Sequence, residues 1–281
     1  MPHYDTRNKD RVSADLIMCR WAAYRGNPVF LETLLTEPTH SLIAQSRASR
    51  EAPQPAHGDG FGLAWYGERP EPGHYRDVLP AWSDCNLQSL ARQVRSGLFL
   101  AHVRASTGSA TSRQNCHPFV HARWSFMHNG HIGEFARLER RLEAHLSNML
   151  YQRRQGATDS ELLFLLALQF GLARDPYGAV SAAIALVADE AANLGIEPVI
   201  RATLAFSEGE AIYATRFASD GAAPSLYLRE GPDGISLVSE PLDAHEPGWR
   251  EIAPQSFLTL DERGVSLRPF NPLRQVQALR A

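Results

Sequence analysis

The sequence predicts an α+β fold in which two antiparallel sheets pack against each other and are covered by helices. Segments of β type come first along the chain, helical segments follow, and further β segments complete it, unlike a regular βαβ alternation. No glycine-rich phosphate loop follows a strand, so a nucleotide-binding Rossmann or P-loop fold has little support.

Strand segments are expected where short apolar runs are bounded by turn residues. These segments are Phe61–Tyr66, Leu98–Val103, Trp124–Met127, Val199–Phe206, Ala211–Thr215, Ser225–Arg229, Ile235–Val238 and Phe257–Leu260. Helical spacing is clearest at 134–146, where Phe135, Leu138 and Leu142 share one face. Two further helices are expected near Ser160–Ala173 and Tyr177–Leu194.

Composition describes an ordinary globular chain. The 281 residues are 44% hydrophobic and 21% charged, with a formal net charge of −3. Because no basic run is present, we expect neither nucleic acid nor a membrane surface as a partner, and a small-molecule substrate instead. The most apolar stretch, Leu162–Ala173, is shorter than the ~18 residues that argue for a membrane span.

We expect a single domain at 19–281, preceded by a leader at 1–18. The leader is polar and lacks the apolar segment of a secretory signal, which favours a cytoplasmic protein. Three scattered cysteines suit a reducing compartment better than a disulfide framework or a zinc site. Cys19 directly follows Met18 and is the candidate nucleophile, since a free α-amine on the same residue would supply a base. A free cysteine is more commonly a small buried hydrophobe.

Asn129 and Gly130 are candidates for an oxyanion hole. They follow a short β run, and we expect them in the turn that ends it, with the Gly130 N–H and the Asn129 amide pointing inward. Deleting one such donor costs about 3 kcal/mol of transition-state stabilisation. Asn-Gly is also the commonest hairpin turn, so these two residues alone decide nothing.

Arg104 and Asp159 are candidates for binding the two charged groups of an amino acid. Arg104 ends an apolar strand, where its planar guanidinium can grip a carboxylate or form a surface ion pair. Asp159 can hold an α-ammonium group. It also lies within Thr158-x-x-Glu161, which fits a helix capping box, so a structural role competes.

Two further features are weaker. The glycine-dense segment "GDGFG" at Gly58–Gly62 is interpreted as pocket wall. A histidine-rich neighbourhood suggests a metal site, but acidic ligands at suitable spacing are not evident, so a structural role is expected. Its members are His117, His121, His128 and His131.

Taken in order, these motifs resemble the class II, or Ntn-type, glutamine amidotransferases. The stretches that carry the resemblance are "MCRWAAYRG", "TEPTHSLIAQS", "GDGFGLAWY", "PAWSDCNL", "AHVRAST", "NCHPF", "FMHNG" and "TDSE". They are most similar to stand-alone members: YafJ-type bacterial proteins, the amidotransferase-like subunit of the fungal glutathione-degrading complex, and the ergothioneine-pathway γ-glutamyl hydrolase. The resemblance extends from about Met18 to Phe217.

The resemblance implies an αββα four-layer sandwich of Ntn-hydrolase type. It also implies that Cys19 is the nucleophile and its α-amine the base, that Asn129 and Gly130 form the oxyanion hole, and that no metal or organic cofactor is needed. For substrate binding it implies Arg104, Thr107 and Asp159.

One departure from the family bears on activity. In the family the cysteine directly follows the initiator methionine, whereas seventeen residues precede Met18 here. Translation starting at Met18 is the favoured explanation; a cleaved propeptide and an inactive copy are the alternatives. The leading hypothesis is hydrolysis of a γ-glutamyl amide through a glutamyl-thioester, alone or with a separate partner subunit. The alternatives are a catalytically silent γ-glutamyl-binding or partner-stabilising subunit and, last, a histidine-liganded metallohydrolase.

Overall fold

The computed structural model describes residues 19–51, 56–105, 110–197, 199–243 and 248–273, and within them the strands form two antiparallel sheets. The strands of the first sheet are β1 (Arg20–Phe30), β2 (Phe61–Tyr66), β3 (Gly73–Asp77), β4 (Arg95–Val103), β9 (Tyr227–Glu230), β10 (Gly234–Val238) and β11 (Arg250–Glu251). Their spatial order is β11-β9-β10-β1-β4-β2-β3, which places β1 in the middle.

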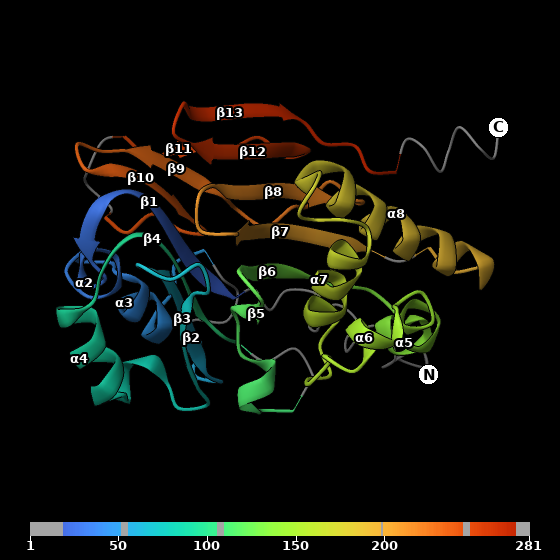
Figure 1. The fold of residues 1–281 in the computed structure, drawn as a ribbon, viewed down its shortest axis with the longest axis horizontal. Helices are drawn as coiled ribbons and strands as arrows, with labels where there is room; N and C mark the ends of the chain where they lie inside the picture. Colours follow the sequence, from blue (N-terminus) through green and yellow to red (C-terminus); the bar gives the residue numbers. More distant parts are fainter. Residues whose placement is uncertain (1–18, 52–55, 106–109, 198, 244–247, 274–281) are drawn as a thin grey trace, which may run out of the picture.

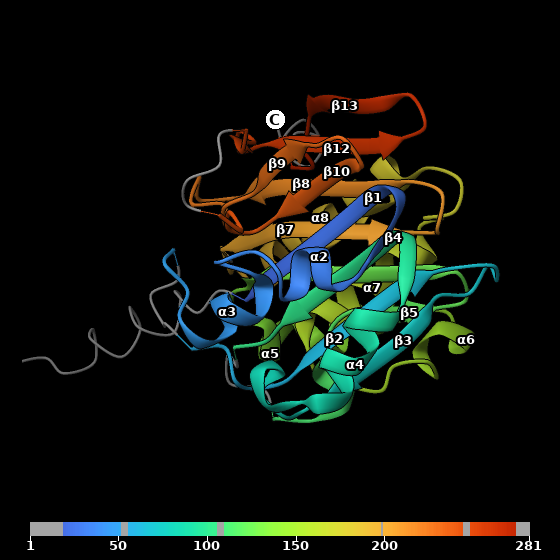
Figure 2. The ribbon, with the colours of Figure 1, turned by 90° about the vertical axis from the view of Figure 1, so that its left-hand side faces the viewer.

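The second sheet begins with the edge strand β5 and ends with β13. Its strands are β5 (Phe119–His121), β6 (Trp124–Ile132), β7 (Ile200–Ser207), β8 (Ile212–Ala218), β12 (Ser256–Asp261) and β13 (Gly264–Pro269). Their order is β13-β12-β8-β7-β6-β5. Figure 2 shows β1 and β4 of the first sheet running obliquely across β7 and β8 of the second.

Helices lie on the outer side of each sheet (Figure 1). The first sheet is covered by α2 (Glu32–Leu35), α3 (Leu42–Arg47) and α4 (Cys85–Gln93). On the side of the second sheet are α5 (Phe135–Glu143), α6 (Asn148–Tyr151), α7 (Asp159–Gln169) and α8 (Pro176–Asn193). Short 3₁₀ turns lie at Ala81–Ser83 and Arg113–Asn115.

Three apolar layers hold the four structural layers together. One joins α2–α4 to the outer face of the first sheet, and another joins α5–α8 to the outer face of the second. The third lies between the sheets, where Trp21 and Ala23 of β1 meet Met127 of β6. Side chains alternate across a strand, so the odd-numbered residues at the start of β1 face the second sheet. The expected αββα sandwich is confirmed.

Helix α7 explains the most apolar stretch of the sequence. It packs against β6 on one side and α8 on another, and its residues from Ser160 to Ala167 are all buried. A helix that is apolar all round belongs inside a protein or a membrane. Among the helices that the structure describes, none combines the length and apolar character that crossing a bilayer requires.

The expected strands and the three expected helices are all present, with ends shifted by a few residues. The prediction missed β1, β3, β5, β11 and β13, together with the short helices α2, α3, α4 and α6. These missed elements are either short or, like β1, rich in alanine and arginine, which are weak strand signals.

One local prediction is wrong. Asn129 and Gly130 do not lie in a turn, because β6 continues to Ile132 and pairs these residues with Thr203 and Ala202 of β7. Gly130 has a φ of 146°, and a Cβ there would lie 1.9 Å from the carbonyl oxygen of Arg201. Only glycine fits this close strand approach, so the Asn-Gly pair reflects a strand irregularity and not a hairpin.

Tyr66 of β2 ties the two sheets together at one end. Its buried hydroxyl lies 2.8 Å from the carbonyl oxygens of Arg123 and Ser207 and 2.9 Å from the Ser125 hydroxyl. Burial raises the pKa of Tyr66 to about 12, so the hydroxyl stays protonated and can donate.

Replacing Tyr66 with phenylalanine should therefore lower the free energy of unfolding by about 1–3 kcal/mol, because buried acceptors lose their donor. Urea denaturation followed by circular dichroism measures this difference. The matched control is Tyr151→Phe, since Tyr151 is exposed on α6 and should change stability little. Equal stabilities of the two variants would show that the Tyr66 hydroxyl does not link the sheets.

Candidate active site

Cys19 lies immediately before β1, at the point where β4 ends. The two strands run antiparallel and pair Arg20 with Val103, so the start of one strand meets the end of the other. The half-buried Cys19 thiol approaches the carbonyl oxygen of Ala105 at 3.5 Å. This pairing brings Cys19 to Arg104, although 84 residues separate them in the sequence.

The surroundings of Cys19 shift the pKa of its thiol in opposite directions. Burial raises the pKa of the thiol above its ordinary value, and the Asp159 carboxylate adds to that rise. The backbone of Ala105 and the positive charges of Arg104 and Arg20 oppose it. These couplings place Arg104 and Asp159, the two predicted binding residues, in the electrostatic surroundings of the same sulfur.

Arg104 is buried and is held by the glycine-dense segment. Its backbone N–H donates to Gly60 O at 2.8 Å, its side chain donates to Asp59 O at 3.2 Å, and Asp59 N–H donates back to Arg104 O at 3.0 Å. Gly60 has a φ of 115°, and a Cβ there would lie 2.5 Å from the Cys116 sulfur. The segment interpreted as pocket wall therefore lies directly beside Arg104.

Asp159 is the first residue of α7, and Thr158 is its N-cap. The Thr158 hydroxyl accepts from Glu161 N–H at 3.1 Å, while the Glu161 carboxylate accepts from the N–H groups of Gln155 and Gly156, so only half of the expected capping box forms. Because Thr158 caps the helix, the Asp159 carboxylate is not needed as its N-cap.

The Asp159 carboxylate joins α7 to β6. It accepts from Ile132 N–H at 2.7 Å with one oxygen and from Ser160 N–H at 2.7 Å with the other. These bonds fix the carboxylate where β6 ends. The remaining acceptor capacity of its oxygens can receive an ammonium group.

Asn129 is fully buried on the face of β6 that points toward the first sheet, like Met127 two residues earlier. Neither atom of its side-chain amide has a hydrogen-bond partner among the described residues. An unpaired buried amide costs about 1–3 kcal/mol, so such a group is usually kept for a ligand or for water. β6 contacts both β1 and β4, which carry Cys19 and Arg104 at their ends.

The histidines of this neighbourhood make contacts within the fold, and His117 and His128 are buried. His128 bonds to Ser160 and to Arg201 O, each at 2.9 Å, while His117 stacks on His102 with ring centroids 4.3 Å apart. Burial lowers the pKa of His102 to about 3 and that of His117 well below its ordinary value. His121 is the last residue of β5, and His131 lies near the end of β6. Within the described ranges, no group of three or more His, Cys, Asp or Glu side chains could hold a metal ion.

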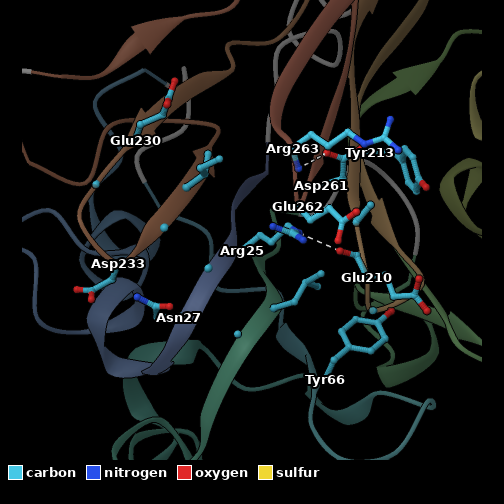
Figure 3. Close-up of a pocket in the computed structure, with 18 of the residues that line it drawn as sticks. Arg25, Asn27, Tyr66, Glu210, Tyr213, Glu230, Asp233, Asp261, Glu262 and Arg263 are labelled. Atoms are coloured by element: carbon cyan, nitrogen blue, oxygen red, sulfur yellow. Dashed lines mark hydrogen bonds between the residues drawn. The ribbon is translucent and has the colours of Figure 1, made fainter.

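A wide pocket of about 1100 Å³ lies elsewhere, and its lining includes residues 25–27 in the middle of β1 (Figure 3). Arg25 reaches across it to Glu210 O at 2.9 Å, and acidic side chains such as Asp261 and Glu262 line it. None of Cys19, Arg104, Asn129 and Asp159 borders this pocket. These four residues, which the sequence predicts for catalysis and substrate binding, therefore lie away from this pocket, near the start of β1 and the end of β4.

Two predictions fall outside the described residues: Thr107 and the leader at 1–18. The sequence analysis missed two residues near Cys19, the candidate nucleophile. Buried Arg20 forms an ion pair with buried Glu240 at 2.9 Å. Because 220 positions separate Arg20 from Glu240, no local pattern in the sequence predicts this ion pair. A charged residue directly after a candidate nucleophile is a signal that could have indicated an opposite charge nearby.

Comparisons with known proteins show the family to which the chain belongs. The family model "Glutamine amidotransferases class-II" matches residues 33–232. The chain is 33% identical to "Probable glutamine amidotransferase DUG3" of Saccharomyces cerevisiae, over 90% of this chain and 84% of that protein. It is 27% identical to the "Gamma-glutamyl-hercynylcysteine sulfoxide hydrolase" of Mycolicibacterium smegmatis, over 90% of this chain and 100% of that protein.

A solved structure agrees as well. The glutamine aminotransferase class-II domain protein of Silicibacter pomeroyi matches with a TM-score of 0.74 and 43% identity, covering 90% of this chain and 99% of that one. The resemblance drawn from the motifs is confirmed, and with it the Ntn-hydrolase type of the sandwich. The chain therefore belongs to the class II glutamine amidotransferases and is an enzyme of that type.

Proposed function

We propose that the protein hydrolyses the γ-glutamyl amide bond of glutamine or of a small γ-glutamyl compound, with Cys19 as an N-terminal nucleophile. The observation that carries the proposal is that two groups of opposite charge act on the sulfur atom of Cys19. The Arg104 cation and the Asp159 anion both act on the Cys19 thiol, and the Asn129 amide, which has no partner among the described residues, faces the sheet that β1 belongs to.

The substrate follows from the two charges. A buried guanidinium binds a carboxylate through two parallel hydrogen bonds, and a carboxylate binds an ammonium group. Arg104 and Asp159 thus suit the α-carboxylate and α-ammonium of a glutamyl group, which would leave its side-chain amide toward Cys19. The name of the mycobacterial relative, a γ-glutamyl compound hydrolase, favours this substrate class.

The reaction proceeds in two halves. The α-amine of Cys19 takes the thiol proton, the thiolate attacks the amide carbon, and the resulting oxyanion accepts hydrogen bonds from Asn129 and the Gly130 N–H. The protonated amine then gives its proton to the leaving nitrogen as the C–N bond breaks, leaving a glutamyl-thioester. Water, deprotonated by the same amine, attacks the thioester and releases glutamate with the thiol restored.

This mechanism requires a free α-amine, whose ordinary pKa is about 7.7–8.0. A Cys19 still joined to Met18 has an amide nitrogen there, which is not basic. We therefore propose that the working form begins at Cys19, after translation from Met18 and removal of that methionine.

Replacing Cys19 with alanine should abolish release of glutamate from glutamine and from γ-glutamyl peptides, because no nucleophile remains. A coupled glutamate assay measures the loss. Cys85→Ala, which alters an exposed thiol on α4, is the matched control and should keep full activity. Activity that survived in Cys19→Ala and disappeared with a chelator would favour the metallohydrolase instead.

Mass spectrometry of the protein expressed from its native gene tests the start of the working form in the same preparation. An N-terminus at Cys19 supports the enzyme. An intact leader in a protein without glutamate release would favour the silent binding subunit.

Asn129→Ala should lower kcat about 10²- to 10³-fold with a smaller effect on KM, because the oxyanion forms only during reaction. Steady-state kinetics with a γ-glutamyl anilide measures both constants. Asn148→Ala, at an exposed position of α6, serves as the control. A kcat equal to that of the control would remove Asn129 from the oxyanion hole.

Arg104→Lys should act mainly on binding. A lysine keeps the positive charge but cannot form the bidentate pair, so we expect KM for glutamine to rise about ten-fold while kcat changes little. The same exchange at exposed Arg140 on α5 provides the comparison. An unchanged KM would mean that Arg104 does not contact the substrate carboxylate.

A further inference from the structure

A buried ionic cluster lies on the other face of β1, behind the nucleophile. Its centre is Glu240, which follows β10 and is 2% exposed, and its cation is Arg20, which is fully buried. Two bonds between Trp21 and Ser239 hold these segments together: Trp21 N–H donates to Ser239 Oγ at 2.9 Å, and Ser239 N–H donates to Trp21 O at 3.0 Å. The cluster is therefore part of the fold and not a surface ion pair.

Hydrogen bonds fix the Glu240 carboxylate on both of its oxygens. One oxygen accepts from His40 and from Arg50 N–H at 2.9 Å, and the other accepts from the Ser49 hydroxyl at 2.6 Å and from Glu51 N–H at 3.1 Å. Burial would raise the pKa of Glu240, but these bonds and the Arg20 charge lower it to about 2. The carboxylate is therefore ionised throughout the working pH range.

Arg20 connects this fixed anion to Cys19. Its Nε–H lies 2.9 Å from both Glu240 and Ser49, and a terminal nitrogen donates to the carbonyl oxygen of Cys19 at 3.3 Å. Its other terminal nitrogen is buried without a partner among the described residues. Because a guanidinium is planar and rigid, fixing its Nε also fixes the direction of the bond to Cys19.

An N-terminal nucleophile needs such a contact. A chain's first residue is held by a single peptide bond, and chain ends fray unless something ties them down. We propose that Arg20, held by Glu240 and Ser49, is a positioning residue that keeps the main chain of Cys19 oriented for attack. The inference rests on the proposed function, in which Cys19 is the nucleophile.

The same cation also acts through its charge. Besides burial, the main groups in the described part of the chain that shift the pKa of the Cys19 thiol are the Ala105 backbone, Arg104, Arg20 and Asp159. In the proposed mechanism the substrate carboxylate pairs with Arg104 and offsets its charge. Arg20 lies on the other face of β1 and keeps its partners during the reaction. Its positive charge favours both the thiolate and the neutral α-amine, which are the reactive forms.

The test compares two substitutions at one position. In Arg20→Lys the charge remains but the rigid fork is lost, so kcat for γ-glutamyl hydrolysis should fall about ten-fold with KM within about two-fold. Arg25→Lys makes the same exchange further along the same strand, outside the candidate site, and should match the wild type. A kcat in Arg20→Lys equal to that in Arg25→Lys would overturn the proposal.

A second readout does not depend on turnover. The rate at which iodoacetamide alkylates Cys19, mapped by peptide mass spectrometry against pH, reports the thiolate, and exposed Cys85 is the internal reference. Arg20→Gln should slow alkylation of Cys19 near pH 7 about ten-fold and move its midpoint to higher pH, while Arg20→Lys leaves the midpoint in place. An unshifted midpoint in Arg20→Gln would contradict the charge effect.

Two further variants keep the result decisive. If Arg20→Gln does not fold, Ser49→Ala removes the two bonds that the Ser49 hydroxyl makes to Arg20 and Glu240 without burying an unpaired charge, and its kcat should fall about three-fold; an unchanged kcat in either Ser49→Ala or Arg20→Lys would overturn the proposal. Cys19→Ala separates the two levels of inference. Activity surviving in Cys19→Ala refutes the proposed function, whereas a dead Cys19→Ala beside a fully active Arg20→Lys refutes only the role of Arg20.

Discussion

The antiparallel pairing of β1 with β4 is the constraint on which the site depends. In such a pair the first residue of one strand lies opposite the last residue of the other. Here that geometry joins Cys19 to Arg104, and the register that pairs Arg20 with Val103 sets the approach. A slip of one residue would turn Cys19 away from the second sheet and send Trp21 out of the layer between the sheets.

The second sheet supplies the complementary groups because both sheets bury the same apolar layer. Met127 packs into that layer, so Asn129, two residues further along β6, points the same way. The carboxylate of Asp159 bonds to the backbone where β6 ends, which carries the start of α7 to the same end of the sandwich. The site thus combines two sheets and a helix start, and no single element contains it.

The outer face of β1 is constrained as firmly as the inner face. Glu240 accepts from His40 and from residues 49–51 and pairs with Arg20, and the side chains of Glu240, Arg20 and His40 are buried. Breaking one partner out of such a cluster leaves a buried charge uncompensated, so the cluster resists local opening. A firm support directly behind Cys19, the proposed nucleophile, agrees with the need for reacting groups to keep their geometry.

The sequence by itself determined the fold class, the strands that carry continuous apolar runs, the helices α5, α7 and α8, and the candidate residues Cys19, Arg104, Asn129 and Asp159, but not β1, the longest strand that the structure describes. Those inferences rest on local apolar spacing and on motif order, which adjacent residues carry. Tertiary structure alone decided that Asn129 and Gly130 lie within a strand, because β6 pairs there with β7 so closely that a Cβ at position 130 would meet the carbonyl oxygen of Arg201. It alone joined Arg20 to Glu240 as well, since contacts between distant segments depend on how sheets pair and pack, and one strand's sequence does not encode its partner.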